Sequence, residues 1–88
     1  MAAGQQNEPS PETFAVLYEL IGRFNKTGTA LAPEIRFAED LNFDSLVVME
    51  FVAAVEDQFD ISVPLNILPD IATIRDFGVA LEKLLAER

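Results

Sequence analysis

The sequence contains no cysteine, no histidine and no tryptophan. Without cysteine there can be no disulfide framework, thiolate nucleophile or zinc–thiolate site. Without histidine the usual general base near neutral pH is missing, so a serine–histidine–aspartate triad is excluded. The chain has only 88 residues, which leaves room for one small core but not for a second domain or a deep catalytic cleft. We therefore expect a protein that works through an exposed site.

Basic residues are scarce. Six lysines and arginines stand against 15 acidic residues, for a formal charge of -9. Binding to nucleic acid or to an anionic lipid surface needs cations, so the charge argues against both. It predicts instead that the partners of this protein carry basic surfaces.

Long apolar runs are absent as well. No stretch approaches the roughly 20 residues that a membrane-spanning helix needs, although half of the chain is apolar. The first residues show neither a basic segment followed by an apolar one nor the arginines of a transit peptide. These features predict a cytoplasmic protein with no membrane insertion.

The negative charge is concentrated in the middle of the chain. Residues 34–60, which we call the acidic middle, contain a single base, Arg36, and eight acids: Glu34, Glu39, Asp40, Asp44, Glu50, Glu56, Asp57 and Asp60. The segments on either side are nearly neutral. A partner with a basic surface is therefore expected to meet the acidic middle.

The chain begins with polar and small residues, which predict a flexible lead-in over residues 1–10 before a single domain over residues 11–88. Ser10 followed by proline is typical of a helix start. The first helix should end between residues 25 and 28, where asparagine and glycine favour the left-handed conformation. The connection that follows, residues 29–41, carries apolar side chains and is expected to pack on the core.

Two further helices have clear start signals. Asp44 is a good N-cap for a helix over residues 45–59. Thr73 and Asp76 have the spacing of a capping box before a helix over residues 74–86. Between them, residues 65–71 allow only a short helix. No polar and apolar alternation supports a sheet, so we predict an all-α fold, a small four-helix bundle with three main helices and one short helix.

The helix over residues 45–59 has two distinct faces. Its buried stripe is predicted to consist of Val48, Phe51, Val52, Val55 and Phe59. The opposite face combines acidic residues with small or flexible apolar ones: Leu46, Met49, Glu50, Ala53, Glu56 and Asp57. Charge steers encounter and apolar groups supply contact area, so this face is predicted to bind partner proteins.

Ser45 is the residue with chemical interest. No base is available to activate it, so it cannot act as a nucleophile without help. At the start of a helix, however, its hydroxyl is exposed, and a phosphodiester built on it would face free N–H groups and the positive end of the helix dipole. Ser45 is therefore a good attachment point. An isolated Asp-Ser pair is also ordinary material for a helix start.

Three motifs occur in register along the chain. They are Leu-Asn-Phe-Asp-Ser-Leu at residues 41–46, Phe-Asp-Ile-Ser-Val-Pro at residues 59–64 and Thr-Ile-Arg-Asp-Phe at residues 73–77. Together with the acidic helix between them, they resemble the acyl carrier proteins, and the resemblance covers about residues 11–85.

The resemblance implies a function for the exposed serine. In that family the serine carries 4′-phosphopantetheine, whose thiol holds acyl chains as thioesters, so Ser45 would be the attachment residue and Asp44 would help the transferase. The partners would be a phosphopantetheinyl transferase and enzymes that use acyl groups, such as acyltransferases and ketosynthases. They would dock on the face described above, and the carrier would act as a monomer. No metal site is implied in the carrier itself. An acyl chain would lie among apolar residues, for which the candidates are Phe51, Val55, Leu65, Ile67, Leu68 and Ile71.

Some positions depart from the common family pattern. Where Leu-Gly-x-Asp-Ser is common, this chain has Asn42 and Phe43, and a run of carboxylates after Pro64 is replaced by Leu-Asn-Ile-Leu. Val47 stands where a polar residue is frequent. We expect these residues to place apolar surface around Ser45, and we interpret them as favouring a dedicated lipid or polyketide pathway over housekeeping fatty-acid synthesis. Ordinary drift in a fatty-acid carrier remains an alternative interpretation.

Three other classes of function are weighed. A peptidyl or aminoacyl carrier shares the serine but is usually less acidic. A non-carrier adaptor that binds a basic helix would not need Ser45. A calcium-binding protein would need a 12-residue ligand loop with a glycine, and the sequence has none.

Overall fold

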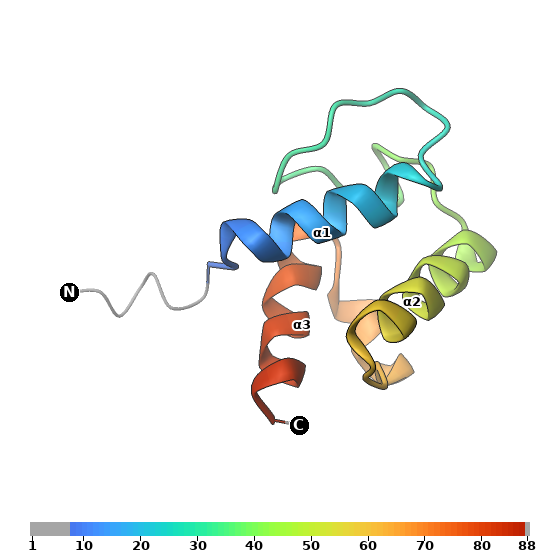
Figure 1. Ribbon diagram of the computed structural model, residues 1–88. Helices are drawn as coiled ribbons and strands as arrows, with labels where there is room; N and C mark the ends of the chain where they lie inside the picture. The colour runs from blue at the N-terminus through green and yellow to red at the C-terminus, as the bar shows by residue number, and fades with distance from the viewer. Residues whose placement is uncertain (1–7, 88) are drawn as a thin grey trace.

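Three α-helices and one short 3₁₀ helix make up the computed structural model, which describes residues 8–87 (Figure 1). The elements are α1 (Pro11–Gly22), α2 (Ser45–Phe59), η2 (Leu65–Asp70) and α3 (Ile74–Glu87). Within the described residues there is no β-strand, and one isolated bridge joins Arg36 to Thr73. The predicted all-α bundle of three main helices and one short helix is confirmed. No helix within residues 8–87 has the length and apolar character needed to cross a membrane.

Helix α1 starts where the sequence predicts and ends earlier. The Ser10 side chain accepts a hydrogen bond from the backbone N–H of Thr13 at 3.3 Å, and proline takes the first helical position. The helix ends at Gly22 rather than between residues 25 and 28. The reason is a tighter final turn, in which the Phe24 N–H bonds to the Ile21 carbonyl at 2.9 Å and the Phe24 ring meets Phe51 edge-on.

Helix α2 occupies the predicted residues 45–59. The Asp44 carboxylate accepts a hydrogen bond from the Val47 N–H at 2.9 Å, which confirms Asp44 as the N-cap. At the other end Asp60 adopts a left-handed conformation with φ 57°, and its N–H bonds back to the Glu56 carbonyl. This reversal turns the chain so that the segment after α2 runs back beside the helix.

The capping box before α3 is confirmed in both directions. The Asp76 N–H donates to the Thr73 hydroxyl and the Thr73 N–H donates to the Asp76 carboxylate, each at 3.0 Å. Burial raises the pKa of Asp76, but the hydrogen bonds from Ala72 and Thr73 outweigh it, so the net pKa lies below its ordinary value. Helix α3 therefore starts at the expected residue and extends one residue past the expected end, to Glu87.

The core lies between α1 and the two helices that it contacts, α2 and α3 (Figure 1). Its fully buried members come from all three helices: Leu17, Leu20, Ile21, Phe51, Val55, Ile74 and Leu81. The long connection between α1 and α2 also packs inward, as predicted, since Phe37 and Leu41 are buried and Leu31 and Ile35 are half-buried. Four phenylalanine rings, Phe37, Phe43, Phe51 and Phe77, contact one another on the side of the core that faces η2.

The segment just before α1 is held against α3. Pro9 is buried over Gly78, and the Glu82 carboxylate accepts hydrogen bonds from the Ser10 N–H at 2.8 Å and the Thr13 hydroxyl at 2.7 Å. These bonds lower the pKa of Glu82. Residues 8–10 thus differ from the expected flexible lead-in over residues 1–10, because Glu82 supplies an acceptor that the sequence order does not reveal. Residues 1–7 lie outside the described part of the chain.

Candidate functional site

The turn that leads into α2 is held in place by a buried aromatic side chain. Asn42 takes a left-handed conformation with φ 59°, which glycine and asparagine tolerate best. This explains why asparagine can replace the glycine of the common family pattern. The next side chain, Phe43, is only 6% exposed and its ring lies 5.9 Å from that of Phe37 and 6.4 Å from that of Phe51. The anchored turn fixes the position of Asp44 and of the residue after it.

Ser45 is the first residue of α2, and its side chain is exposed. The Val47 N–H is satisfied by Asp44, and the first helical bond runs from the Val48 N–H to the Asp44 carbonyl at 2.9 Å. The N–H groups of Ser45 and Leu46 therefore have no acceptor within the helix. An anionic group attached to Ser45 would meet these donors and the positive end of the helix dipole.

Apolar side chains surround Ser45 on the surface. Three large hydrophobic residues are exposed among those described, namely Leu46 at 67%, Met49 at 51% and Leu65 at 58%. The first two come from α2 and the third from η2. Because a small protein seldom leaves its large hydrophobic residues together in water, this grouping is typical of an interaction surface.

The acidic residues of α2 fall into two kinds. Glu50 and Asp57 are exposed, and so is Ala53 between them, as expected for a docking face. Glu56 is half-buried, and its carboxylate accepts a hydrogen bond from the Val63 N–H at 2.7 Å. Glu56 therefore stabilises the returning chain. No local pattern predicts this bond, because it depends on the reversal at Asp60.

A groove of about 350 Å³ lies beside Ser45. It is formed by the start of α2 and by η2, with Phe43, Val48, Met49, Leu65 and Leu68 around Asp44 and Ser45. Apart from Asp44 and Ser45, every residue in its wall is apolar. The groove is thus suited to the apolar part of a group attached to the serine.

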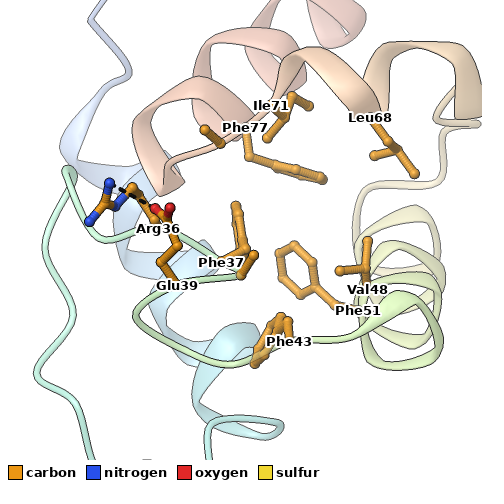
Figure 2. Close-up of a pocket in the computed structure, with 11 residues that line it drawn as sticks. Arg36, Phe37, Glu39, Phe43, Val48, Phe51, Leu68, Ile71 and Phe77 are labelled. Atoms are coloured by element: carbon orange, nitrogen blue, oxygen red, sulfur yellow. Dashed lines mark ion pairs between the residues drawn. The ribbon is translucent and has the colours of Figure 1, made fainter.

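A second cavity, also of about 350 Å³, lies behind this groove (Figure 2). Its apolar lining consists of four phenylalanine rings together with Ala38, Val48, Leu68, Ile71 and Ala72. The Arg36–Glu39 ion pair lies at the opposite end from Val48 and Leu68 (Figure 2). Phe43, Val48 and Leu68 line both the groove and the cavity, so they separate the two.

The six predicted acyl-chain residues are distributed over several places. Phe51, Leu68 and Ile71 line the cavity. Val55 is fully buried in the core, Leu65 lines the groove at Ser45, and Ile67 lines another groove beside α3. Sequence reasoning missed Phe37, Phe43, Val48 and Phe77 as lining residues. Two signals were available: the inward placement expected for residues 29–41 pointed to Phe37, and the buried stripe predicted for the helix over residues 45–59 included Val48.

Phe43 lines the groove beside Ser45, but it adds almost none of the exposed apolar surface that was expected from it. Phe43 is buried, because the turn at Asn42 directs its ring towards Phe37 and Phe51. Val47 is half-buried and adds little exposed area. Of the residues that depart from the common pattern, Leu65 is the one that is strongly exposed beside Ser45.

Comparisons with known proteins point to one family. The family model described as "Phosphopantetheine attachment site" matches residues 15–81. The chain is 46% identical over 50 residues to the acyl carrier protein of Helicobacter hepaticus, a match covering 57% of this chain and 66% of the relative. It is 39% identical over 61 residues to acyl carrier protein 1, chloroplastic, of Hordeum vulgare, covering 69% of this chain and 40% of the relative. The chain thus spans less than two thirds of these two relatives.

A solved structure shares the fold. It is described as an acyl carrier protein from Mycobacterium tuberculosis, and it aligns with a TM-score of 0.69 and 24% identity over 85% of this chain and 96% of that one. The helical bundle and the phosphopantetheine model together define a carrier domain. The chain belongs to the acyl carrier protein family, whose covalently bound cofactor is phosphopantetheine and whose members are not enzymes.

Proposed function

We propose that Ser45 carries 4′-phosphopantetheine and that the protein presents acyl chains, held as thioesters on this arm, to the enzymes that use them. The observation that carries the proposal is the exposed hydroxyl of Ser45. It stands at the start of α2, where two backbone N–H groups have no acceptor within the helix, and it lies beside an apolar groove. When bound, the cofactor supplies the thiol that the sequence lacks. The protein itself positions the cofactor and its acyl chain, because a tether raises the effective concentration of the acyl chain at a docked enzyme.

The chain's own residues fit this attachment. Within the described residues, no side chain donates to or accepts from the Ser45 hydroxyl, so a transferase has free access to it. The serine has no base of its own, and the transferase supplies both base and metal. Asp44 adds a carboxylate next to the hydroxyl, and we propose that the transferase uses it to hold its metal and substrate.

Partner enzymes are proposed to dock on one face beside Ser45. Leu46, Met49 and Ala53 supply the apolar contact area, and Glu50 and Asp57 steer basic surfaces towards it. The partners are the phosphopantetheinyl transferase and enzymes such as acyltransferases or ketosynthases. Glu56 belongs to the same surface, but removing its side chain also removes the bond to Val63. Docking assays on Glu56 variants therefore need a stability control.

Mass spectrometry tests the attachment directly. The protein is treated with a broad-specificity phosphopantetheinyl transferase and coenzyme A, and its intact mass is measured. We expect a gain of one phosphopantetheine, which Ser45→Ala abolishes. Ser62→Ala, which changes another exposed serine, should leave the gain intact. A chain that gains no mass would contradict the proposal and favour an acidic adaptor.

We also propose a dedicated lipid or polyketide pathway rather than housekeeping fatty-acid synthesis. The support is Leu65, whose side chain is 58% exposed beside Ser45 where carboxylates are common in the family. An apolar residue there would favour partners with an apolar contact next to the arm. Expression in a cell that lacks its general carrier tests this proposal. Full rescue of fatty-acid synthesis would contradict it, and no rescue despite complete modification would support it.

A further inference from the structure

The cavity behind the Ser45 groove has two different ends. At the end near Ser45, Phe43 is buried while Val48 and Leu68 are half-buried. These three side chains also line the groove, so the separation between groove and cavity is one layer of apolar side chains. Small rotations of Val48 and Leu68 would join the two spaces. An acyl chain carried on the arm at Ser45 would then enter the cavity from this end.

The other end is open and charged. Arg36, Ala38, Glu39 and Ala72 line it, and all four are exposed. The Arg36 Nη1 atom lies 2.7 Å from the Glu39 carboxylate, and the Arg36 Nε atom lies 3.6 Å from the Asp40 carboxylate. The side chains of Arg36 and Glu39 are 52% and 63% exposed, so water reaches the pair. Figure 2 shows this pair across the phenylalanine rings from Val48 and Leu68.

The middle of the cavity is aromatic. The rings of Phe37, Phe51 and Phe77 lie between the two ends, with centroids 5.1 to 6.1 Å apart. They favour apolar methylene groups and offer no hydrogen bond. A chain that passes through the cavity would therefore have an apolar middle, and its far end would lie at the charged opening.

The chemistry of the far end of the chain follows from these charges. A chain that ends in a methyl group would displace water from the Arg36–Glu39 ion pair and would form no hydrogen bond in return. A carboxylate would meet Glu39 and Asp40 as well as Arg36, so repulsion would offset the attraction. A hydroxyl can donate to Glu39 and accept from Arg36, whose guanidinium carries five N–H donors. A neutral group that both donates and accepts hydrogen bonds thus fits best.

We propose that this cavity selects acyl chains that end in a hydroxyl group, with the hydroxyl at the Arg36–Glu39 pair. The proposal rests on the proposed function, because it takes the chain to be attached at Ser45. The length follows from the volume. A cavity of about 150 Å³ holds a six-carbon benzene ring, so at the same volume per carbon one of about 350 Å³ holds at most roughly 14 carbons. The proposed cargo is therefore a medium-length ω-hydroxyacyl chain.

The test compares chains of equal length with different ends. The transferase loads the protein from octanoyl-, 8-hydroxyoctanoyl- and 7-carboxyheptanoyl-coenzyme A, and intact mass confirms each loading. The half-life of the thioester in hydroxylamine then measures how well the chain is held inside, and the melting temperature measures the stability that it adds. We expect the hydroxyoctanoyl thioester to last roughly threefold to tenfold longer than the octanoyl one, the factor that one net hydrogen bond gives. The carboxylate chain should be protected least.

A double variant shows where the end of the chain lies. Arg36→Leu with Glu39→Leu makes the opening apolar, so octanoyl should become better protected than hydroxyoctanoyl. The matched control is Arg75→Leu with Glu8→Leu, which removes another exposed ion pair, of 3.1 Å, that does not line the cavity. This control should keep the original order of protection.

The outcomes separate this inference from the proposed function. Equal protection of the three chains, or better protection of octanoyl in the unchanged protein, would overturn the inference while successful loading at Ser45 still supports a carrier. If the hydroxyoctanoyl thioester is still better protected than the octanoyl one in the Arg36/Glu39 variant, the inference is overturned as well, because the hydroxyl would then lie elsewhere. If Ser45 cannot be loaded at all, the proposed function fails and this inference fails with it.

Discussion

We propose that Asp44 combines two tasks in one side chain. Its carboxylate caps α2 by accepting the Val47 N–H at 2.9 Å, and it stands next to the exposed hydroxyl of Ser45. Capping requires an oxygen acceptor, whereas metal binding by a transferase favours the negative charge. The two tasks can therefore be separated by a substitution that keeps the shape of the side chain and removes its charge.

We predict that Asp44→Asn retains the stability of the protein and impairs its modification. Asparagine caps about as well as aspartate, whereas Asp44→Ala should lower the free energy of unfolding by about 1 kcal/mol. Modification of the asparagine variant by the transferase should slow roughly tenfold or more. Urea unfolding and the rate of mass gain measure the two effects. Equal modification rates for wild type and Asp44→Asn would show that Asp44 serves the fold alone.

Glu82 is a residue whose charge state should influence stability. Its folded-state pKa lies below the ordinary value of 4.5 because the Ser10 N–H and the Thr13 hydroxyl donate to the carboxylate. A lowered folded pKa means that the stabilisation is complete above the unfolded pKa and is lost as the pH falls through the folded pKa.

We predict that wild type and Glu82→Gln differ in stability by a constant amount above about pH 5.5 and that this difference shrinks below about pH 4.5. Measuring the difference removes the general effect of protonating the many other carboxylates. The exposed Glu87, on the same helix, provides the control variant Glu87→Gln. A wild-type advantage that grows on acidification would contradict this assignment.

At the scale of elements, the helices were easier to predict from the sequence than the contacts between distant segments of the chain. Proline, serine, aspartate and threonine caps act within a few residues, so the starts of α1, α2 and α3 were all predictable. The buried ring of Phe43, the bond from Val63 to Glu56 and the packing of Pro9 on Gly78 join segments that only the fold brings together. Those features, and with them the true cavity wall, could not be predicted from local patterns.

The contact of the first segment with α3 supplies a further prediction. A Cβ atom at Gly78 would lie 2.7 Å from Cγ of Pro9, too close for a rigid ring. Gly78→Ala should therefore lower the free energy of unfolding by about 1 kcal/mol or more, since overpacking of about 1–3 kcal/mol exceeds the gain in helix propensity. In a Pro9→Gly background, the same change should become neutral or stabilising. Urea unfolding of the four proteins tests this, and a loss that persists without Pro9 would contradict it.

At the scale of the whole molecule, we expect the acidic middle to influence stability as well as recognition. The net charge is -9, and most of it lies within the 27 residues 34–60. Like charges closer than the screening length, about 8 Å at physiological salt, repel one another. Within the described residues, Arg36 pairs with Glu39 and Asp40, and Arg36 is the only base of the acidic middle. The folded protein should therefore be under electrostatic repulsion.

We predict that added salt or millimolar divalent cations raise the melting temperature, by roughly 5 °C or about 1 kcal/mol. Glu50→Gln combined with Asp57→Asn removes two exposed charges and should make the rise with salt shallower. Thermal unfolding followed by circular dichroism measures both. A melting temperature that is insensitive to salt would mean that the carboxylates are too far apart to matter.

The central claim is that a chain without a reactive group of its own receives one at Ser45. The most direct measurement is peptide mass spectrometry of the protein purified after expression together with a phosphopantetheinyl transferase. The account predicts one phosphopantetheine, with or without an acyl chain, on the peptide that contains Ser45 and on no other serine. An unmodified Ser45 peptide, or a phosphopantetheine on a different residue, would contradict the account.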